Sequence, residues 1–212
     1  MKSVPSAFDS TLFKPTLSKD RTLVVRTAAP LPSKELSFFF DLAERLPSFR
    51  FVLALVTCSE QEGYAAELRD LHRRRNSPVE LLFDLPREKI AELVGRAGLY
   101  VHTAVPPGKD HATRIGMPIS IAEAMATAAH VPVRDLPALI SYVGNAGQTY
   151  SSLDRAAEII VATAAWSEGR WTDAWKASVN RAFSLYADDL VIDRIHEDWL
   201  RLAGADIRNQ AG

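Results

Sequence analysis

The chain has 212 residues, of which 47% are hydrophobic and 24% charged, and its 25 Lys and Arg residues almost balance its 26 Asp and Glu residues. This composition predicts one soluble globular domain with a sizeable core and argues against nucleic acid as a partner. The single cysteine, Cys58, excludes a disulfide framework, and no signal peptide or membrane-spanning run is visible, so we expect a cytoplasmic protein.

Short runs with β-strand character alternate along the chain with longer runs of helical periodicity. Strands are expected at 22–27, 49–57, 79–83, 99–104 and 130–133. Helices are expected at 33–46, 59–75, 86–97, 118–129, near 137–144, and at 153–167, 170–187 and 189–204. Several strands are apolar throughout, which is typical of parallel strands covered on both faces. The alternation therefore predicts an α/β layer fold with right-handed crossovers.

Several of the expected helices carry signals at their ends. Ser33 is an N-cap candidate for the helix at 33–46, and Pro86 suits the first turn of the helix at 86–97. The helix at 59–75 begins acidic and ends in basic residues, which matches the helix dipole. We interpret that basic run as a solvated helix end.

Two connections are candidates for ligand-binding loops. Residues 26–34 join the first strand to its helix, and residues 104–118 join the fourth strand to the next helix. The second connection is long for such a link. Both follow the carboxyl ends of strands, where open α/β sheets bind ligands.

The start of the helix at 118–129 is suited to an anionic ligand, because a helix N-terminus presents free N–H groups and partial positive charge. Gly116 permits close backbone approach, and Pro118 sacrifices only an N–H that has no helical partner. Glu123, one turn further on, can accept paired hydroxyl donors such as those of a ribose. Arg26 and Lys34 can add positive charge to the same anion. Together these residues describe a pocket for a nucleoside diphosphate.

Other interpretations of these residues stay open on the sequence alone. Glu123 is equally compatible with a rim carboxylate on a half-exposed helix. Arg26 and Lys34 are compatible with solvated loop charges, since most surface charges bind nothing specific. His102, at a strand end, fits a structural role better than a catalytic one. Asp193, His196 and Glu197 have helical spacing, but an amphipathic helix explains them better than a metal site does.

Several segments resemble the donor-binding half of GT-B glycosyltransferases, the family-4-like group that uses nucleotide sugars with retention. "EAMA" (123–126) followed by "VGNAG" (143–147) is similar to that family's late signature. "VPSAFDSTLFKP" (4–15) resembles the family's entry into this domain, and "LPREKIAELVGRAGLYVHTA" (85–104) resembles a later segment without a gap. The resemblance covers about residues 4–170 in order.

The resemblance implies a role for each matching residue. Glu123 matches the second Glu of the family's E-x7-E signature, which holds the ribose hydroxyls of the donor. Arg26 and Lys34 match its basic pair on the donor diphosphate, and Gly116 matches the glycine after the first Glu. The turn around the sugar and phosphates corresponds to residues Met117, Pro118, Ile119 and Ser120. No metal or other cofactor is implied, because the cations and the helix N-terminus offset the charge of the leaving group.

This chain departs from the family pattern at positions that matter for the sugar. The first Glu of the signature is replaced by Ile115. Arg26 and Lys34 are further apart than in the family pattern. His111 and Arg114 lie in the long connection before Ile115, and they are candidates to replace the missing contacts.

The resemblance implies a Rossmann-like three-layer α/β/α domain at 21–170, an entry segment at 1–20 and a helical extension at 171–212. It also implies an N-terminal, acceptor-binding domain, supplied by the same or another chain, and peripheral membrane contact through the complete enzyme. The expected function is transfer of a sugar from a nucleoside-diphosphate sugar to an acceptor such as a glycan or a lipid-linked saccharide. The alternative is a degenerate module that docks a partner without turnover. A Rossmann oxidoreductase is excluded, because the first strand is not followed by a Gly-x-Gly-x-x-Gly turn.

Overall fold

Parallel strands form the centre of the fold in the computed structural model of the chain, which describes residues 7–58, 61–106, 108–110 and 118–210. The strands are β1 (Asp20–Ala28), β2 (Arg50–Leu55), β3 (Glu80–Phe83), β4 (Ala97–Tyr100), β5 (Pro132–Arg134) and β6 (Gln148–Tyr150). They pair in the orders β3-β2-β1-β4 and β5-β6. Parallel bridges from Leu99 to His130 and from His102 to Val133 place β5 beside β4. The resulting order, 3-2-1-4-5-6, is that of doubly wound nucleotide-binding sheets.

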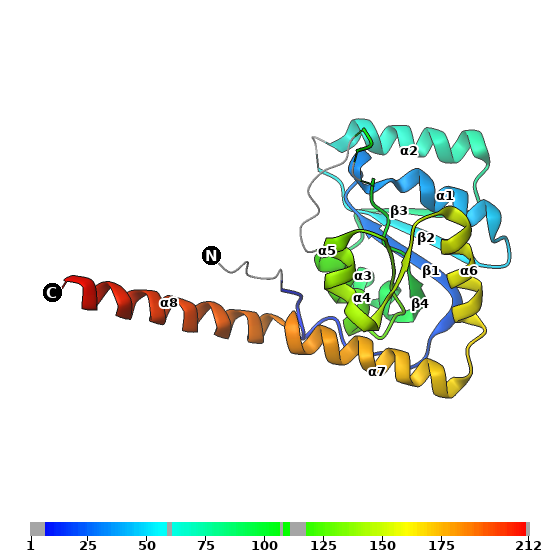
Figure 1. Cartoon of the computed structure of the whole chain (residues 1–212). Coiled ribbons are helices and arrows are strands. Elements are labelled where there is room, and N and C mark those ends of the chain that lie inside the picture. The colour runs from blue at the N-terminus through cyan, green and yellow to red at the C-terminus, as the bar shows by residue number, and fades with distance from the viewer. Residues whose placement is uncertain (1–6, 59–60, 107, 111–117, 211–212) are drawn as a thin grey trace.

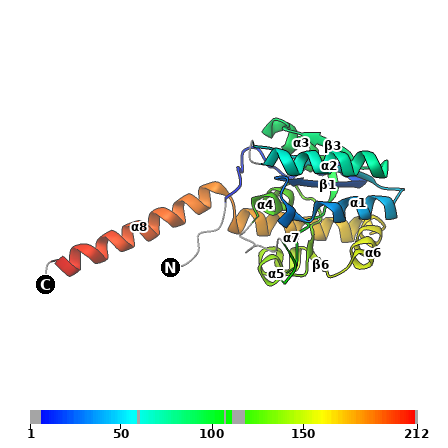
Figure 2. The same ribbon diagram turned by 90° about the horizontal axis from the view of Figure 1, so that it is seen from above.

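Helices cover both faces of the sheet (Figures 1 and 2). Their bounds are η1 (Pro32–Lys34), α1 (Leu36–Arg45), α2 (Glu62–Arg75), α3 (Arg87–Arg96), α4 (Ile119–Ala126), α5 (Pro137–Val143), η3 (Gly144–Ala146), α6 (Leu153–Ala164), α7 (Glu168–Leu185) and α8 (Asp188–Gln210). One apolar core unites α3, α4, α5 and α7 with the sheet, and a second unites α1, α2 and α6 with it. The predicted α/β fold with a parallel sheet is therefore confirmed.

The apolar run of β1 explains why two cores form. Leu23 and Val25 belong to the core with α3 and α4, whereas Val24 points into the core with α1 and α6. All three side chains are fully buried. A strand covered on both faces has no polar side to alternate with, which is why its sequence is continuously apolar.

The N-terminal segment meets the junction of α7 and α8 beside this domain. Phe8 is fully buried, its amide donates to the carbonyl oxygen of Tyr186 (3.0 Å), and its carbonyl accepts from the amide of Asp188 (3.1 Å). α7 packs against α4, and its Arg181 donates to the carbonyl oxygens of Ser141 (2.6 Å) and Tyr142 (2.7 Å) at the end of α5. The entry segment and α7 therefore hold α4 and α5 in place.

α8 leaves the domain and projects away from it in both views (Figures 1 and 2). Leu190 and Val191, in the first turn of α8, are buried or partly buried against the domain, whereas Ile192, Trp199 and Leu200 are 61–67% exposed. Asp193 and His196 are also exposed. No helix among the described residues is both long enough and apolar enough to cross a bilayer.

Two details differ from the sequence-based expectations. β6 was not expected, and its three residues lie where a connection to the next helix was predicted. Ser33 was expected to cap a helix at 33–46, but it lies within η1, and α1 begins after Glu35. Glu35 has left-handed backbone angles (φ 48°, ψ 49°), which break the helix between the two elements.

Lys19 ties together the C-terminal ends of two helices. Its Nζ donates to the carbonyl oxygens of Gly95, in α3, and Thr127, which caps α4, both at 2.6 Å. No carboxylate of the described residues pairs with it. Burial lowers the pKa of Lys19 to about 7 from 10.5.

We expect the stability of the wild-type chain to rise with pH relative to Lys19→Met. Above about pH 7 the unfolded chain keeps a proton on Lys19 that the folded chain releases, so raising the pH favours the folded state, by at most about 1.4 kcal/mol per pH unit. Urea unfolding of both chains at about pH 7 and about pH 9 measures this difference. A difference that does not change between the two pH values contradicts the lowered pKa.

Candidate functional site

A cleft lies at the carboxyl ends of the strands, between the neighbouring strands β1 and β4. From β1 the chain continues toward one edge of the sheet, through β2 and β3, and from β4 it continues toward the other edge; ligands bind at such switch points in open α/β sheets. Its volume is ≈ 450 Å³. Its walls come from the end of β1, from η1, from the segments after β2, β3 and β4, and from the first turn of α4. The lining residues are Arg26, Thr27, Ala28, Ala29, Lys34, Val56, Leu85, Arg87, Ile90, His102, Pro118, Ile119, Ser120 and Glu123.

Arg26 lies on β1, and its side chain is 1% exposed. Its Nη1 donates to the carbonyl oxygen of Thr27 and to the hydroxyl of Tyr100, both at 2.9 Å, and its Nη2 donates to the carbonyl oxygen of Thr103 at 3.2 Å. Its buried Nε has no hydrogen-bond partner among the described residues, and none of their carboxylates pairs with the guanidinium. The interpretation of Arg26 as a solvated loop charge is therefore wrong. A buried cation without a counter-ion is costly, and such sites favour an anionic ligand.

Lys34 and His102 share the cleft with Arg26. Burial and the nearby Arg26 lower the pKa of Lys34. His102 is 2% exposed, and burial together with Arg26 and Lys34 holds its pKa well below the ordinary value, so its imidazole is neutral. Arg26 and Lys34 are both positively charged and repel each other, and no carboxylate of the described residues pairs with either of them to offset their charge. They therefore create a local positive potential in the cleft. Arg26 and Lys34 are thus brought together as predicted.

Glu123 points into the cleft from the second turn of α4. Its side chain is 4% exposed, so the interpretation of a half-exposed rim carboxylate is wrong. Nη2 of Arg87 donates to Oε1 of Glu123 at 2.7 Å, and Arg87 itself is half exposed. Burial raises the pKa of Glu123, and the charge of Arg87 opposes that rise. Oε2 accepts no hydrogen bond from the described residues, so one acceptor oxygen of this buried carboxylate is available beside the cleft.

We expect Arg87→Ala to move the pH dependence of nucleotide binding. Without Arg87, burial raises the pKa of Glu123 further, so the carboxylate is protonated at a higher pH. If nucleotide binding needs the ionised carboxylate of Glu123, then acidification weakens binding to Arg87→Ala at a higher pH than it weakens binding to the wild type. Titrations with UDP between about pH 5 and pH 8 measure this acid limb. Arg96→Ala, an exposed arginine on the same helix, is the matched control, and identical pH profiles in all three chains contradict the expectation.

The remaining predicted residues are only partly described. Pro118, Ile119 and Ser120 line the cleft, and α4 begins directly after Pro118. The other four residues with expected donor contacts lie outside the described part of the chain: His111, Arg114, Gly116 and Met117. Arg87 was not singled out from the sequence, because its partner Glu123 is 36 residues away and no local pattern connects them.

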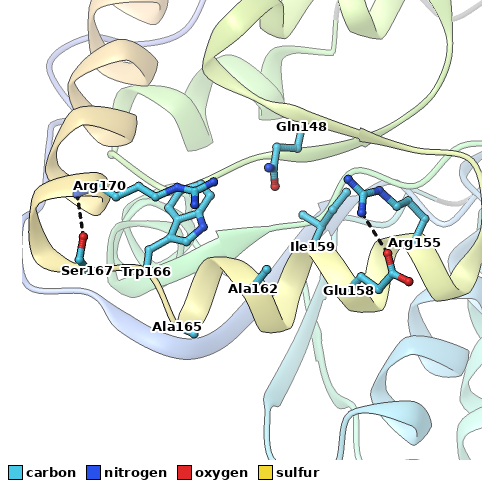
Figure 3. A pocket seen from close by; sticks show the side chains of 9 residues that line it. All are labelled: Gln148, Arg155, Glu158, Ile159, Ala162, Ala165, Trp166, Ser167 and Arg170. Atoms are coloured by element: carbon cyan, nitrogen blue, oxygen red, sulfur yellow. Dashed lines mark hydrogen bonds and ion pairs between the residues drawn. The ribbon is translucent and has the colours of Figure 1, made fainter.

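A second cavity, of ≈ 470 Å³, lies at the opposite edge of the sheet, beside the start of β6 (Figure 3). Gln148 points into it, and Arg155 and Arg170 flank it from α6 and α7. Arg155 pairs with Glu158 at 3.0 Å, and Arg170 stacks on Trp166 at 4.3 Å. These arginines are exposed, so this cavity lacks the buried, unpaired cation of the first one.

No group of three or more His, Cys, Asp or Glu side chains that could hold a metal ion occurs among the described residues. The expectation that the reaction needs no metal stays a prediction.

Comparisons with solved structures find the same fold in glycosyltransferases. HepE of Anabaena, in complex with UDP and glucose, matches with a TM-score of 0.74 and 17% identity over 92% of this chain and 55% of its own. Sucrose-phosphate synthase of Thermosynechococcus elongatus matches with a TM-score of 0.78 and 15% identity over 96% of this chain and 53% of its own. AviGT4, a glycosyltransferase involved in avilamycin A biosynthesis, matches with a TM-score of 0.68 and 18% identity over 95% of this chain and 57% of its own.

Sequence comparison alone does not find these relationships: no protein-family model matches the chain, and no curated protein matches it. The chain spans slightly more than half the length of the proteins whose structures it matches. The shared part includes the parallel sheet and the helices that cover it. This agrees with the resemblance to the donor-binding half of GT-B glycosyltransferases that the sequence motifs indicate. The chain therefore has the Rossmann-like fold of one half of a GT-B glycosyltransferase.

Proposed function

We propose that the chain binds a nucleoside-diphosphate sugar as the donor part of a glycosyltransferase. The observation that carries this proposal is the buried guanidinium of Arg26, which lines a cleft at the switch point of the sheet and has no carboxylate partner among the described residues. A diphosphate supplies the missing negative charge. The complexes of HepE with UDP, with UDP and glucose, and with UDP-glucose support this choice of ligand.

The cleft offers complementary groups for the two ends of a nucleoside diphosphate. Arg26 and Lys34 face the diphosphate, and the first turn of α4 adds the partial positive charge of a helix N-terminus. Glu123 accepts hydrogen bonds from the ribose hydroxyls through the oxygen that Arg87 leaves available. The apolar side chains of Val56, Leu85 and Ile90 line the same cleft.

In the proposed transfer, the chain stabilises the leaving group. As the bond from the sugar to the diphosphate breaks, negative charge grows on the departing phosphate oxygen. Arg26 is already desolvated and Lys34 partly so, which makes their attraction to that charge stronger than in water. The acceptor, such as a glycan or a lipid-linked saccharide, enters from a second domain of the same or another chain.

Calorimetric titration with UDP, GDP and ADP, and with their glucose-linked forms, tests the proposal. We expect one of the three nucleotides to bind with a Kd below about 1 mM and its sugar-linked form to bind at the same site. If none of the six ligands binds at that concentration, the donor-site assignment is wrong. If a nucleotide binds but its sugar form is never consumed, even with an acceptor domain present, the chain is a binding module without turnover.

A further inference from the structure

The residue that follows Lys34 adopts a costly conformation. Glu35 has left-handed backbone angles, φ 48° and ψ 49°, in which an L-residue with a side chain is about 1–2 kcal/mol less stable than in the right-handed form. It ends η1 and precedes α1, and its amide donates to the carbonyl oxygen of Pro32 at 3.1 Å. A residue held in this region persists only where its surroundings impose it, and such residues gather at functional sites.

Arg134 supplies the interaction that holds Glu35. It is the last residue of β5, its side chain is 7% exposed, and its Nη2 pairs with the carboxylate of Glu35. Its Nε donates to the carbonyl oxygen of Ala104 at 3.3 Å, and its Nη1 donates to that of Ser151 at 3.2 Å. These bonds anchor Arg134 to the ends of two neighbouring strands, so Glu35 is fixed to the carboxyl edge of the sheet.

Two aromatic rings pack against the guanidinium of Arg134. Its guanidinium lies 4.7 Å from the ring centre of Phe38, in the first turn of α1, and 5.3 Å from that of Tyr150. The two rings stack on each other at 5.4 Å. Arg134 therefore joins the start of α1 to β5 and β6 through both charge and packing.

The backbone on the other side of Lys34 is fixed as well. The hydroxyl of Thr103 donates to the carbonyl oxygen of Lys34 at 2.6 Å, and the amide of Val105 donates to that of Ser33 at 3.1 Å. The amide of Lys34 donates to the carbonyl oxygen of Leu31 at 2.9 Å. Because its main chain is held at each neighbouring residue, the direction of the Cα–Cβ bond of Lys34 is fixed, and the side chain lines the cleft.

We propose that the Arg134–Glu35 ion pair positions Lys34 for the diphosphate, with Arg134 as a positioning residue that does not itself touch the ligand. A buried ion pair adds little net stability but fixes one arrangement out of several. Here it imposes the left-handed turn at Glu35, and that turn sets where the preceding residue points. The choice of a diphosphate as the ligand rests on the proposed function, whereas the restraint that the ion pair places on the loop does not.

The test uses Glu35→Gly, Arg134→Met and the double variant. Glycine adopts the left-handed angles without cost, so Glu35→Gly keeps the turn accessible while it removes the ion pair. The double variant also removes the buried charge that Arg134 keeps, unpaired, in Glu35→Gly. Arg45→Met is the matched control, because Arg45 pairs with Asp154 at 2.7 Å and joins the other end of α1 to α6.

We expect the two single variants to weaken UDP binding by about tenfold and the double variant by no more than either, because both remove one interaction. Binding of uridine, which lacks phosphates, should stay within about twofold of the wild type, and Arg45→Met should leave both ligands unaffected. In the free protein, hydrogen exchange at the amide of Lys34 should be faster by about tenfold or more in each single variant, with unchanged exchange at Val25 in β1.

Two results overturn the proposal. One is an unchanged exchange rate at Lys34 in both variants, which shows that the pair does not restrain the loop. The other is an equal loss of UDP and uridine binding, which shows a general effect on the cleft. If the wild-type chain binds none of UDP, GDP and ADP, the proposed function fails, and the exchange rate at Lys34 alone decides whether the pair positions this residue.

Discussion

Arg26→Met is expected to abolish most nucleotide binding without destabilising the free protein. The guanidinium is the buried charge that faces the diphosphate in the proposed complex, and removing one partner of a desolvated charge pair costs about 2–5 kcal/mol. UDP should therefore bind about 100-fold more weakly or worse. In the unliganded chain, methionine removes the cost of a buried, unpaired charge but also three hydrogen bonds, so the stability should change little.

Calorimetry with UDP and thermal unfolding without ligand measure the two effects on the same samples. Arg155→Met is the control, since Arg155 lies beside the second cavity at the far edge of the sheet (Figure 3). The opposite pattern, with a lower Tm and unchanged affinity, assigns Arg26 a structural role and removes the main support for the donor site.

Glu123→Gln is expected to erase the preference for a ribose over a deoxyribose. The buried carboxylate accepts hydroxyl donors, and the neutral amide is a weaker acceptor that can also present its NH₂ group. UDP should bind at least about tenfold more weakly to the variant, whereas binding of 2′-deoxy-UDP should change much less. The wild-type chain should prefer UDP over 2′-deoxy-UDP, and the variant should bind both alike.

Titration of both ligands into the wild type, Glu123→Gln and Glu88→Gln provides the comparison. Glu88 is exposed in the first turn of α3 and serves as the matched control. If Glu123→Gln weakens both ligands by the same factor, the carboxylate does not contact the 2′-hydroxyl.

The fold was predictable because its central strands β1, β2 and β4 are mostly buried on both faces. Continuous apolar runs such as that of β1 leave little choice but a parallel sheet between helices. β6 was missed because it is three residues long and two of them are only partly buried, so neither length nor periodicity distinguishes it from a loop. Its pairing with β5, rather than any local preference, makes it a strand.

The sequence was sufficient to predict the main charged residues of the cleft but not the ion pairs that hold them in place. Arg26, Lys34 and Glu123 were identified from position and residue type, and the fold brings all three to one cleft. The ion pairs of Glu123 with Arg87 and of Glu35 with Arg134 join residues 36 and 99 positions apart. Such pairs depend on where two elements meet in space. For the same reason, the sequence could not predict that the helix is broken at Glu35, because the break is stabilised by Arg134, which is distant in the sequence.

A crystal structure of the chain with a bound nucleoside diphosphate tests the central claim most directly. The account predicts diphosphate oxygens within hydrogen-bonding distance, about 3.2 Å or less, of Nε of Arg26 and Nζ of Lys34. It also predicts a ribose hydroxyl at the same distance from Glu123. A diphosphate found instead between Arg155 and Arg170, at the opposite edge of the sheet, would contradict the account, because the buried cation of β1 would then have no part in binding.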